Sequence, residues 1–416
     1  MLTGRRFRVE FTAAQTEFTE RIAAACRVVW NTGLEQRREY RRRGAWLNYV
    51  EQCRELAAAK RDHFWLAEAP GHCLQQTLMD LDKACHRHGP FKVHWRSGRR
   101  WEPSFRFPDG KRMPVERLNR RHSQVKLPKL GWVKFRMSRS LAGETIRSAT
   151  VSRVGRHWYI SVLVEDGRQS PDTHEAPGTA VGVDRGVAVA IATSGGDLID
   201  RPFLTDGERR RTVALQRKLS RCAKQSANRA RVRSALARVR ARERHRRQDF
   251  HAQTAHQLAT ANAIVALEGL RTVNMTASAK GTLDQPGRNV KAKSGLNRAI
   301  LSKGWNQFAL ALSSAARYTG TVVVTVPAAY TSQRCSRCGH ADPKSRESQA
   351  VFRCTRCQHH EHADVNAAKN ILAAGLAVTA CEVQPRSADR GRPLKQEPAG
   401  NREELLLQTP SAAGVA

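Results

Sequence analysis

The chain begins with a strand pattern and continues with helix patterns. Phe7, Val9 and Phe11 alternate with charged residues, and this period of two predicts a half-buried strand. Thr12 and Gln15 then have the spacing of a capping box, which predicts that a helix begins here. Apolar residues recur at helical spacing up to about residue 88, so residues 12–88 are predicted to form a helical block. They are Phe18, Ile22, Ala25 and Val29 in a first helix and Leu74, Leu78, Leu81 and Cys85 in a later one, with a helical stretch over residues 47–64 between them.

Short strands are predicted between residues 91 and 165. Residues 132–137 and 157–164 alternate or run apolar, with Gly, Pro and Ser between them, and the opening strand is predicted to join them in a small barrel or sheet. Aromatic and basic residues are interleaved in residues 91–101 and 105–107. Two interpretations are open: a strand edge with solvated arginines and buried rings, or a surface that stacks bases and neutralises phosphates.

From residue 181 onward strand and helix patterns alternate, which predicts an α/β sheet. Two apolar runs surround Asp184, a buried-strand pattern ends at Glu268, and another strand is predicted over residues 321–326. After about residue 378 the composition turns to Pro, Arg, Glu, Gln and Ser, which predicts a disordered tail.

A strongly basic helical stretch lies between the first two of these strands. Residues 209–247 contain sixteen Lys and Arg against one acid, Glu243. Such a run is usually the solvated face of a helix. At this density of basic residues we favour a positively charged surface that binds a nucleic-acid backbone.

The composition agrees with a polyanionic partner. The 416 residues include 72 Lys+Arg against 37 Asp+Glu, a formal charge of +35, and such an excess repels itself unless nucleic acid shares it. The N-terminal residues have no apolar signal core, and no uncharged apolar run is long enough to cross a bilayer, so we expect a cytoplasmic protein with no membrane partner. Six of the ten cysteines are scattered, as reduced thiols are.

The other four cysteines have the spacing of a zinc site. Cys335-x-x-Cys338 and Cys354-x-x-Cys357 are separated by fifteen residues, which is long enough to return the second pair to the metal held by the first. Three histidines lie close enough to compete as ligands, although the spacing favours four thiolates and a structural Zn²⁺. They are His359, His360 and His362.

Three carboxylates are placed where they can converge. Asp184 and Glu268 end predicted strands, and Asp364 opens a predicted helix after the cysteines. Acids would repel a phosphate backbone unless divalent cations made the local charge positive. Carboxylate oxygens suit Mg²⁺ or Mn²⁺. Two such ions can clamp a scissile phosphate, one activating water and the other stabilising the leaving oxygen.

Each acid taken alone also has an ordinary explanation. Asp364 can be a helix N-cap. Asp184 can serve a tight turn before Gly186, or be a phosphate-site acid like that of sugar-kinase folds. Glu268 can pair with an arginine. The metal interpretation depends on the three acids occurring together and on the cysteine pairs between them.

The combined motifs resemble those of TnpB, the OrfB-type proteins of IS200/IS605 and IS607 transposons, which are related to the compact Cas12 nucleases. The resemblance covers nearly the whole chain. The matching motifs are Gly182-Val-Asp184-Arg-Gly186, Ala266-Leu-Glu268-Gly-Leu270, Thr331-Ser-Gln-Arg-Cys335-x-x-Cys338, Cys354-x-x-Cys357 and Asp364-Val-Asn366-Ala-Ala-Lys-Asn370. Gln358 departs from the Gly that is common at this point of such knuckles, so a strained turn is expected there. Gly269 departs from a frequent Asp or Asn.

The resemblance implies an α+β multidomain protein that acts as an RNA-guided, metal-dependent DNA endonuclease. It implies Asp184, Glu268 and Asp364 as catalytic ligands of Mg²⁺ or Mn²⁺, and a guide RNA and double-stranded target DNA as partners, with base pairing selecting the sequence. The alternatives are an RNA-guided repressor that binds without cutting and a DNA-joining transposase. The expected domains are a wedge-like β-barrel (1–11 and 89–166), a helical recognition block (12–88), a linker (167–179), an RNase H-like RuvC domain (180–330 and 361–377), a zinc module (331–360) and a disordered tail (378–416).

Overall fold

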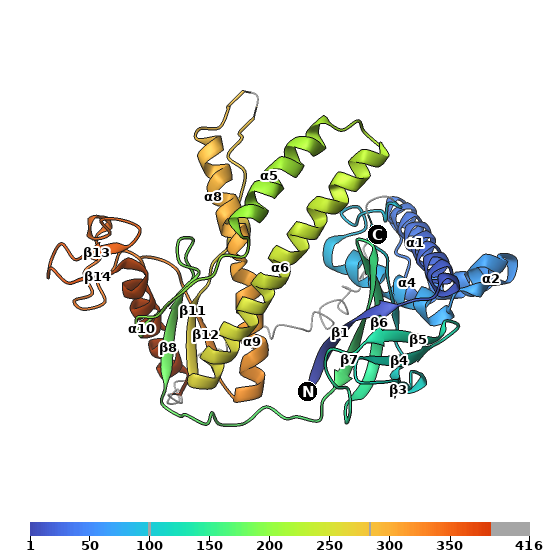
Figure 1. The fold of residues 1–416 in the computed structure, drawn as a ribbon, viewed down its shortest axis with the longest axis horizontal. Coiled ribbons are helices and arrows are strands. Elements are labelled where there is room, and N and C mark those ends of the chain that lie inside the picture. Colours follow the sequence, from blue (N-terminus) through green and yellow to red (C-terminus); the bar gives the residue numbers. More distant parts are fainter. Residues whose placement is uncertain (99–100, 283, 384–416) are drawn as a thin grey trace, which may run out of the picture.

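The computed structural model describes residues 1–98, 101–282 and 284–383, and it has two large sheets with helices packed on them and a separate two-stranded sheet (Figure 1). The N-terminal part contains a seven-stranded antiparallel sheet in the order β2-β6-β7-β1-β5-β4-β3, and the later part a five-stranded mixed sheet. The N-terminal strands are β1 (Leu2–Glu10), β2 (Ser104–Phe107), β3 (Val115–Arg117), β4 (His122–Leu127), β5 (Gly131–Arg136), β6 (Thr145–Val154) and β7 (His157–Glu165), with a 3-10 turn η1 (Gly110–Arg112). The helices are α1 (Ala13–Arg42), α2 (Tyr49–Asp62), α3 (Phe64–Glu68) and α4 (Gly71–His88).

The predicted barrel is an open sheet. Its terminal strands, β2 and β3, do not pair with each other in the described residues, so the hydrogen-bonded ring that defines a barrel is missing. The opening strand β1 does join the sheet, as predicted, between β5 and β7. Helices α1 and α4 supply the other half of the core, and the sheet therefore buries its apolar face without curling on itself.

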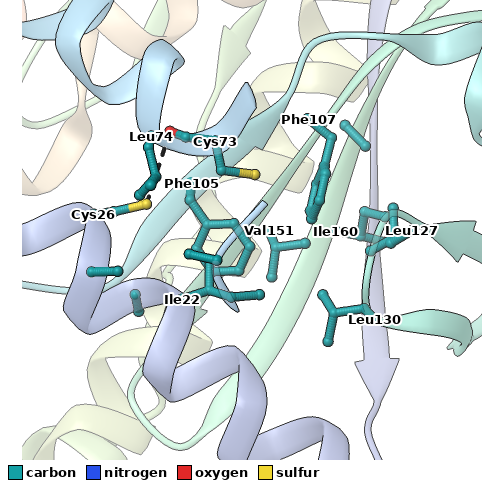
Figure 2. Close-up of a cluster of buried hydrophobic side chains, with 14 of the residues drawn as sticks. Ile22, Cys26, Cys73, Leu74, Phe105, Phe107, Leu127, Leu130, Val151 and Ile160 are labelled. Carbon is teal, nitrogen blue, oxygen red and sulfur yellow. Dashed lines mark hydrogen bonds between the residues drawn. The ribbon is translucent and has the colours of Figure 1, made fainter. Parts of the chain in front are cut away.

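The core between α1, α4 and this sheet decides between the two interpretations for part of the aromatic–basic stretch. Phe105 and Phe107 on β2 are 3% and 2% exposed and lie in one core with Ile22 of α1, Leu74 of α4 and Ile160 of β7 (Figure 2). The base-stacking interpretation is therefore wrong for these two rings. Arg106, between them on the opposite face, forms an ion pair with Asp80. The capping box at Thr12 and Gln15 that starts α1 is confirmed.

The second sheet has the order β10-β9-β8-β11-β12, in which β8, β11 and β12 are parallel and β9 and β10 are antiparallel. Its elements, with the following helices and turns, are β8 (Ala180–Asp184), β9 (Ile191–Thr193), β10 (Leu198–Ile199), α5 (Asp206–Arg221), α6 (Ala227–Ala261), β11 (Ile264–Glu268), α7 (Thr272–Met275), α8 (Val290–Lys303), α9 (Trp305–Thr319), β12 (Val322–Val326), η2 (Pro343–Ser345), β13 (Val351–Arg353), β14 (His360–His362) and α10 (Ala363–Val383).

Helices cover both faces of this sheet, and the two faces differ in residue size. Val183 and Leu267 lie in one core with Phe250 of α6 and Phe308 of α9. Successive strand residues point to opposite faces, so Gly182 and Ala266 face α10 instead. These small residues let α10 lie directly on the strands, which brings the start of α10 to the edge where β8 and β11 end.

Replacing Gly182 with Ala is expected to lower the free energy of unfolding by about 3 kcal/mol, because the added Cβ would lie 2.0 Å from the carbonyl oxygen of Ala368 on α10. Thermal unfolding followed by circular dichroism measures the change. Gly4→Ala is the matched control, since nothing lies within 4 Å of a Cβ at that strand position. Equal melting temperatures for the two variants would contradict the packing described here.

The basic stretch forms the helix pair α5–α6, which projects away from the second sheet (Figure 1). Val232, Leu236 and Val239 are its buried stripe. The predicted tail lies mostly outside the described residues, but α10 continues to Val383, so residues 378–383 are helical and the disorder predicted for them is wrong. None of the helices that the structure describes is long and apolar enough to span a membrane.

Candidate functional site

The structure brings the three predicted acids into one cleft. The parallel strands β8 and β11 pair with Val183 opposite Leu267, so Asp184 and Glu268 reach the same edge of the sheet. Asp364 is the second residue of α10, whose start is held there by packing on β8. All three line a cleft of about 520 Å³.

Burial raises the pKa of two of these carboxyl groups, and neighbouring charge adds to the rise in one of them. Burial raises the pKa of Asp184 to about 7, and the charges of Glu268 and Asp364 add to this effect. Burial also raises the pKa of Glu268, while a hydrogen bond from Thr331 opposes the shift. Oδ2 of Asp364 is buried and accepts no hydrogen bond. An unpartnered oxygen in a cleft with two buried acids and the half-buried Asp184 fits a site that binds a cation.

Arg346 is a residue of this cleft that the sequence did not reveal. Its Nη2 lies 3.0 Å from Oδ1 of Asp364, and its charge partly opposes the rise in the pKa of Asp184 and Glu268. It comes from the segment between the two cysteine pairs. One arginine among 72 Lys and Arg, without a motif of its own, gave no signal.

Buried donors fix the strand ends that carry Asp184 and Glu268. The hydroxyl of Thr331 donates to Oε1 of Glu268. The guanidinium of Arg185 donates to the backbone oxygen of Glu268 and, at 3.2 Å, to that of Trp305. Trp305 in turn donates from Nε1 to the carbonyl of Gly186 at 3.1 Å. The loop after Asp184 is thereby attached to α9 and to β11.

The structure excludes the alternative roles considered for two of the acids, an N-cap for Asp364 and an arginine pair for Glu268. Asp364 lies inside the first turn of α10, so it is not the N-cap. Glu268 forms no ion pair among the described residues. The neighbouring Arg185 bonds to the backbone oxygen of Glu268 instead of its carboxylate.

The four cysteines form the predicted cluster. Their sulfur atoms all lie within 4.8 Å of one another, and among the described residues the cluster includes none of the three nearby histidines. The Cys335–Cys357 and Cys338–Cys354 sulfurs are 3.7 and 3.6 Å apart. A tetrahedron with Zn–S bonds of about 2.3 Å has edges of about 3.8 Å, so this spacing fits zinc.

The two cysteine knuckles have the same backbone turn. Gly339 N–H bonds to the Cys335 carbonyl, and Gln358 N–H bonds to the Cys354 carbonyl, both at 3.0 Å. Gly339 has a φ of 74° and Gln358 a φ of 58°. The left-handed conformation costs a residue with a Cβ about 1–2 kcal/mol, so the strained turn expected at Gln358 is confirmed.

Two asparagines connect the cysteine cluster to α10. The side chain of Asn366 accepts from Ser336 N at 2.9 Å and donates to the Arg334 carbonyl at 2.8 Å. Asn370 donates to the carbonyls of Thr331 and Arg334, at 2.9 and 2.7 Å. The first knuckle is thus fixed to the helix that begins with Asp364, and the hydroxyl of Thr331 reaches Glu268 from the same segment.

Comparisons with known proteins agree with this arrangement. Residues 160–279 match the OrfB_IS605 family, described as "Probable transposase", residues 305–371 match the Cas12f1-like TNB domain, and residues 1–45 match a helix-turn-helix domain of OrfB_IS605. In the structure, residues 1–45 contain strand β1 and the single helix α1.

Two relatives align over almost their full length. The chain is 37% identical over 385 residues to "Putative RNA-guided DNA endonuclease InsQ" of Escherichia coli (strain K12), covering 91% of this chain and 92% of the relative. It is 31% identical to "Putative RNA-guided DNA endonuclease" of Streptomyces pristinaespiralis, covering 95% and 96%. The fold is similar to that of Cas12f1 in a complex with sgRNA and target DNA, with a TM-score of 0.53, 14% identity, and coverage of 87% and 83%.

Proposed function

The chain belongs to the OrfB/TnpB family of IS605-type transposon proteins, and we propose on this premise that it is an RNA-guided endonuclease that hydrolyses phosphodiester bonds in target DNA. The observation that carries the proposal is the convergence of Asp184, Glu268 and Asp364 in one cleft. The net charge of +35 and the basic helices α5 and α6 supply the positive surface that a guide RNA and a DNA duplex require.

We extend the proposal to the domain organisation. Residues 180–330 and 361–377 are the RuvC-like nuclease domain, in which the parallel strands β8 and β11 carry Asp184 and Glu268 and helix α10 carries Asp364. Residues 331–360 are a zinc module that contacts target nucleic acid. Residues 1–11 and 89–166 are the wedge domain, residues 12–88 are the recognition block, and residues 167–179 link the two halves.

Asp184, Glu268 and Asp364 would hold Mg²⁺ or Mn²⁺, and such ions supply Lewis-acid stabilisation of the phosphate charge and a nucleophilic water at neutral pH. The residues around them hold the carboxylates in place. The hydroxyl of Thr331 orients the carboxylate of Glu268. The positive charge of Arg346, a residue of the zinc module, offsets the negative charge of Asp364. Arg346 also lines the cleft, where its guanidinium could contact a phosphate of the DNA.

A cleavage assay on the purified complex tests this function. The protein is purified from its native locus, the RNA that remains bound is sequenced, and a duplex matching that RNA is incubated with and without Mg²⁺. The expected result is a defined transcript that ends in transposon-flanking DNA, and double-strand breaks only with Mg²⁺. Binding without breaks would indicate an RNA-guided repressor, and strand-transfer products formed without RNA would indicate a DNA-joining transposase.

Replacing Thr331 with Val is expected to weaken binding of the catalytic cation and slow cleavage by about ten- to hundredfold, because partners of metal ligands have effects of this size. The buried carboxylate of Glu268 loses its hydroxyl donor in this variant. The cleavage rate is measured as a function of Mn²⁺ concentration. Thr331→Ser, which keeps the hydroxyl, is the control and should restore most of the rate. A Thr331→Val variant with the parental Mn²⁺ dependence would contradict the role given to this hydroxyl.

A further inference from the structure

The loop after α4 is fixed to α1 by side-chain hydrogen bonds to its backbone. Three α1 side chains reach across to residues 90–96 of this loop, so its conformation is set by the helix beneath it. Their bonds are Arg38 to the carbonyls of Pro90 (3.2 Å) and Val93 (2.8 Å), Trp30 to the carbonyl of His94 (3.1 Å), and Asn31 to the N–H (2.9 Å) and carbonyl (3.2 Å) of Arg96.

The anchored loop turns two of its aromatic rings outward. Val93 is buried, and Arg96 lies against the ring of Trp30, with 3.8 Å between its guanidinium carbon and the ring centroid. Phe91 and Trp95, on either side of Val93, remain 55% and 44% exposed. The hydrogen bonds between the loop backbone and α1 therefore hold both rings at the surface.

A third exposed ring and three arginines complete this surface. Trp46, just after α1, is 42% exposed. Arg38, Arg41 and Arg42 lie on neighbouring turns of the same helix face. Their guanidinium carbons lie 4.7 Å from the Trp95 centroid, 5.9 Å from that of Trp46 and 5.9 Å from that of Phe91, respectively. Arg42 is also paired with Glu39 at 3.0 Å, so Arg38 and Arg41 contribute most of the uncompensated charge.

We propose that Trp46, Phe91 and Trp95 form a stacking platform for unpaired nucleotides of the bound RNA, an inference that rests on the RNA-guided function proposed above. Rings accept the faces of unpaired bases whatever their sequence, and neighbouring arginines neutralise the phosphates between them. A base inside a duplex is already stacked and offers no free face, so the platform selects single-stranded segments. The unpaired loops of folded RNA are recognised in this way.

The position of the platform favours RNA, and not the DNA strand that is cut, as its ligand. The platform belongs to α1 and to the loop that follows α4, beside the N-terminal sheet, whereas Asp184 and Asp364 belong to β8 and α10 of the second sheet (Figure 1). A DNA strand that is being cut must enter the carboxylate cleft. Target DNA also arrives as a duplex, while folded RNA carries unpaired bases from the start.

The test compares a triple variant, Trp46→Ala, Phe91→Ala and Trp95→Ala, with the control Phe64→Ala, which removes a 76% exposed ring on α3. The probes are an unstructured 12-nucleotide RNA and the same RNA annealed to its complement, at one fixed salt concentration. The triple variant should bind the single strand about tenfold more weakly for each ring removed, with duplex affinity changed by less than about threefold. The control should change neither affinity. Equal losses for both probes, or no loss for the single strand, would overturn the proposal.

Chemical probing of the assembled complex identifies the occupant. RNA nucleotides that are protected in the parent should become reactive in the triple variant, while the reactivity of the displaced DNA strand should not change. Increased reactivity of the DNA alone would overturn the assignment to RNA. Neither readout needs DNA cleavage, so an inactive nuclease with an intact platform would reject the proposed function and leave this inference standing.

Discussion

Replacing Asp184 with Ala is expected to lower the rate of DNA cleavage by at least about a thousandfold, since the metal contribution of several kcal/mol is lost with its ligand. Asp184 is half-buried beside Glu268 and Asp364, and its carboxylate is one of the three that line the cleft. No nucleic-acid-binding surface is changed, so the affinities for RNA and for duplex DNA should stay near those of the parent. Single-turnover cleavage with radiolabelled duplex and an electrophoretic mobility assay give the two measurements.

The matched control is Asp206→Ala, which removes an exposed carboxylate at the start of α5. This variant should cleave at the parental rate. If Asp184→Ala also cleaves at that rate, the assignment of this acid is wrong. If Asp184→Ala loses both cleavage and RNA binding, the residue supports the fold of the protein instead of the chemistry.

The second large effect is expected from the cysteine cluster. Cys354→Ser should release zinc and lower cleavage by about a hundredfold or more, because the residues that orient the metal ligands lose their own support. The cluster packs with little besides Phe352 and Ala363, a core too small to hold this segment without metal. When the first knuckle loosens, Thr331 no longer reaches Glu268 and Arg346 no longer reaches Asp364.

Three measurements check this second prediction: the zinc content, the hydrogen exchange of residues 331–362 and the cleavage rate. Cys222→Ser, a substitution at the end of α5, is the control and should change none of them. Zinc loss with full cleavage activity would show that the cluster and the carboxylates are independent. Slower cleavage with zinc still bound would place the effect of Cys354 outside metal binding.

The sequence revealed the acids because each one ends or begins a regular element. Val-Gly-Val-Asp184 and Val-Ala-Leu-Glu268 are apolar runs that stop at a carboxylate, and parallel strands bring such ends to one edge. The spacing of the cysteines predicted the four-sulfur cluster in the same local way. Arg346 could not be found, because its position depends on how the segment between the cysteine pairs folds over α10.

The errors in the prediction have a common physical origin. Phe105 and Phe107 have the alternation of an edge strand, and only the packing of α4 decides that both rings are buried. Closure of the N-terminal sheet depends on whether β2 and β3 meet, which no local pattern encodes. Strand and helix identity follows from periodicity along the chain, whereas burial at an edge depends on the element that covers it.

Anomalous diffraction from crystals of the protein–RNA complex soaked in Mn²⁺ shows whether Asp184, Glu268 and Asp364 share divalent cations. We expect anomalous peaks between these three side chains, with carboxylate oxygens at about 2.1 Å, and their loss in Asp364→Asn crystals. Mn²⁺ absent from the cleft, with the three carboxylates bonded only to protein groups, would contradict it.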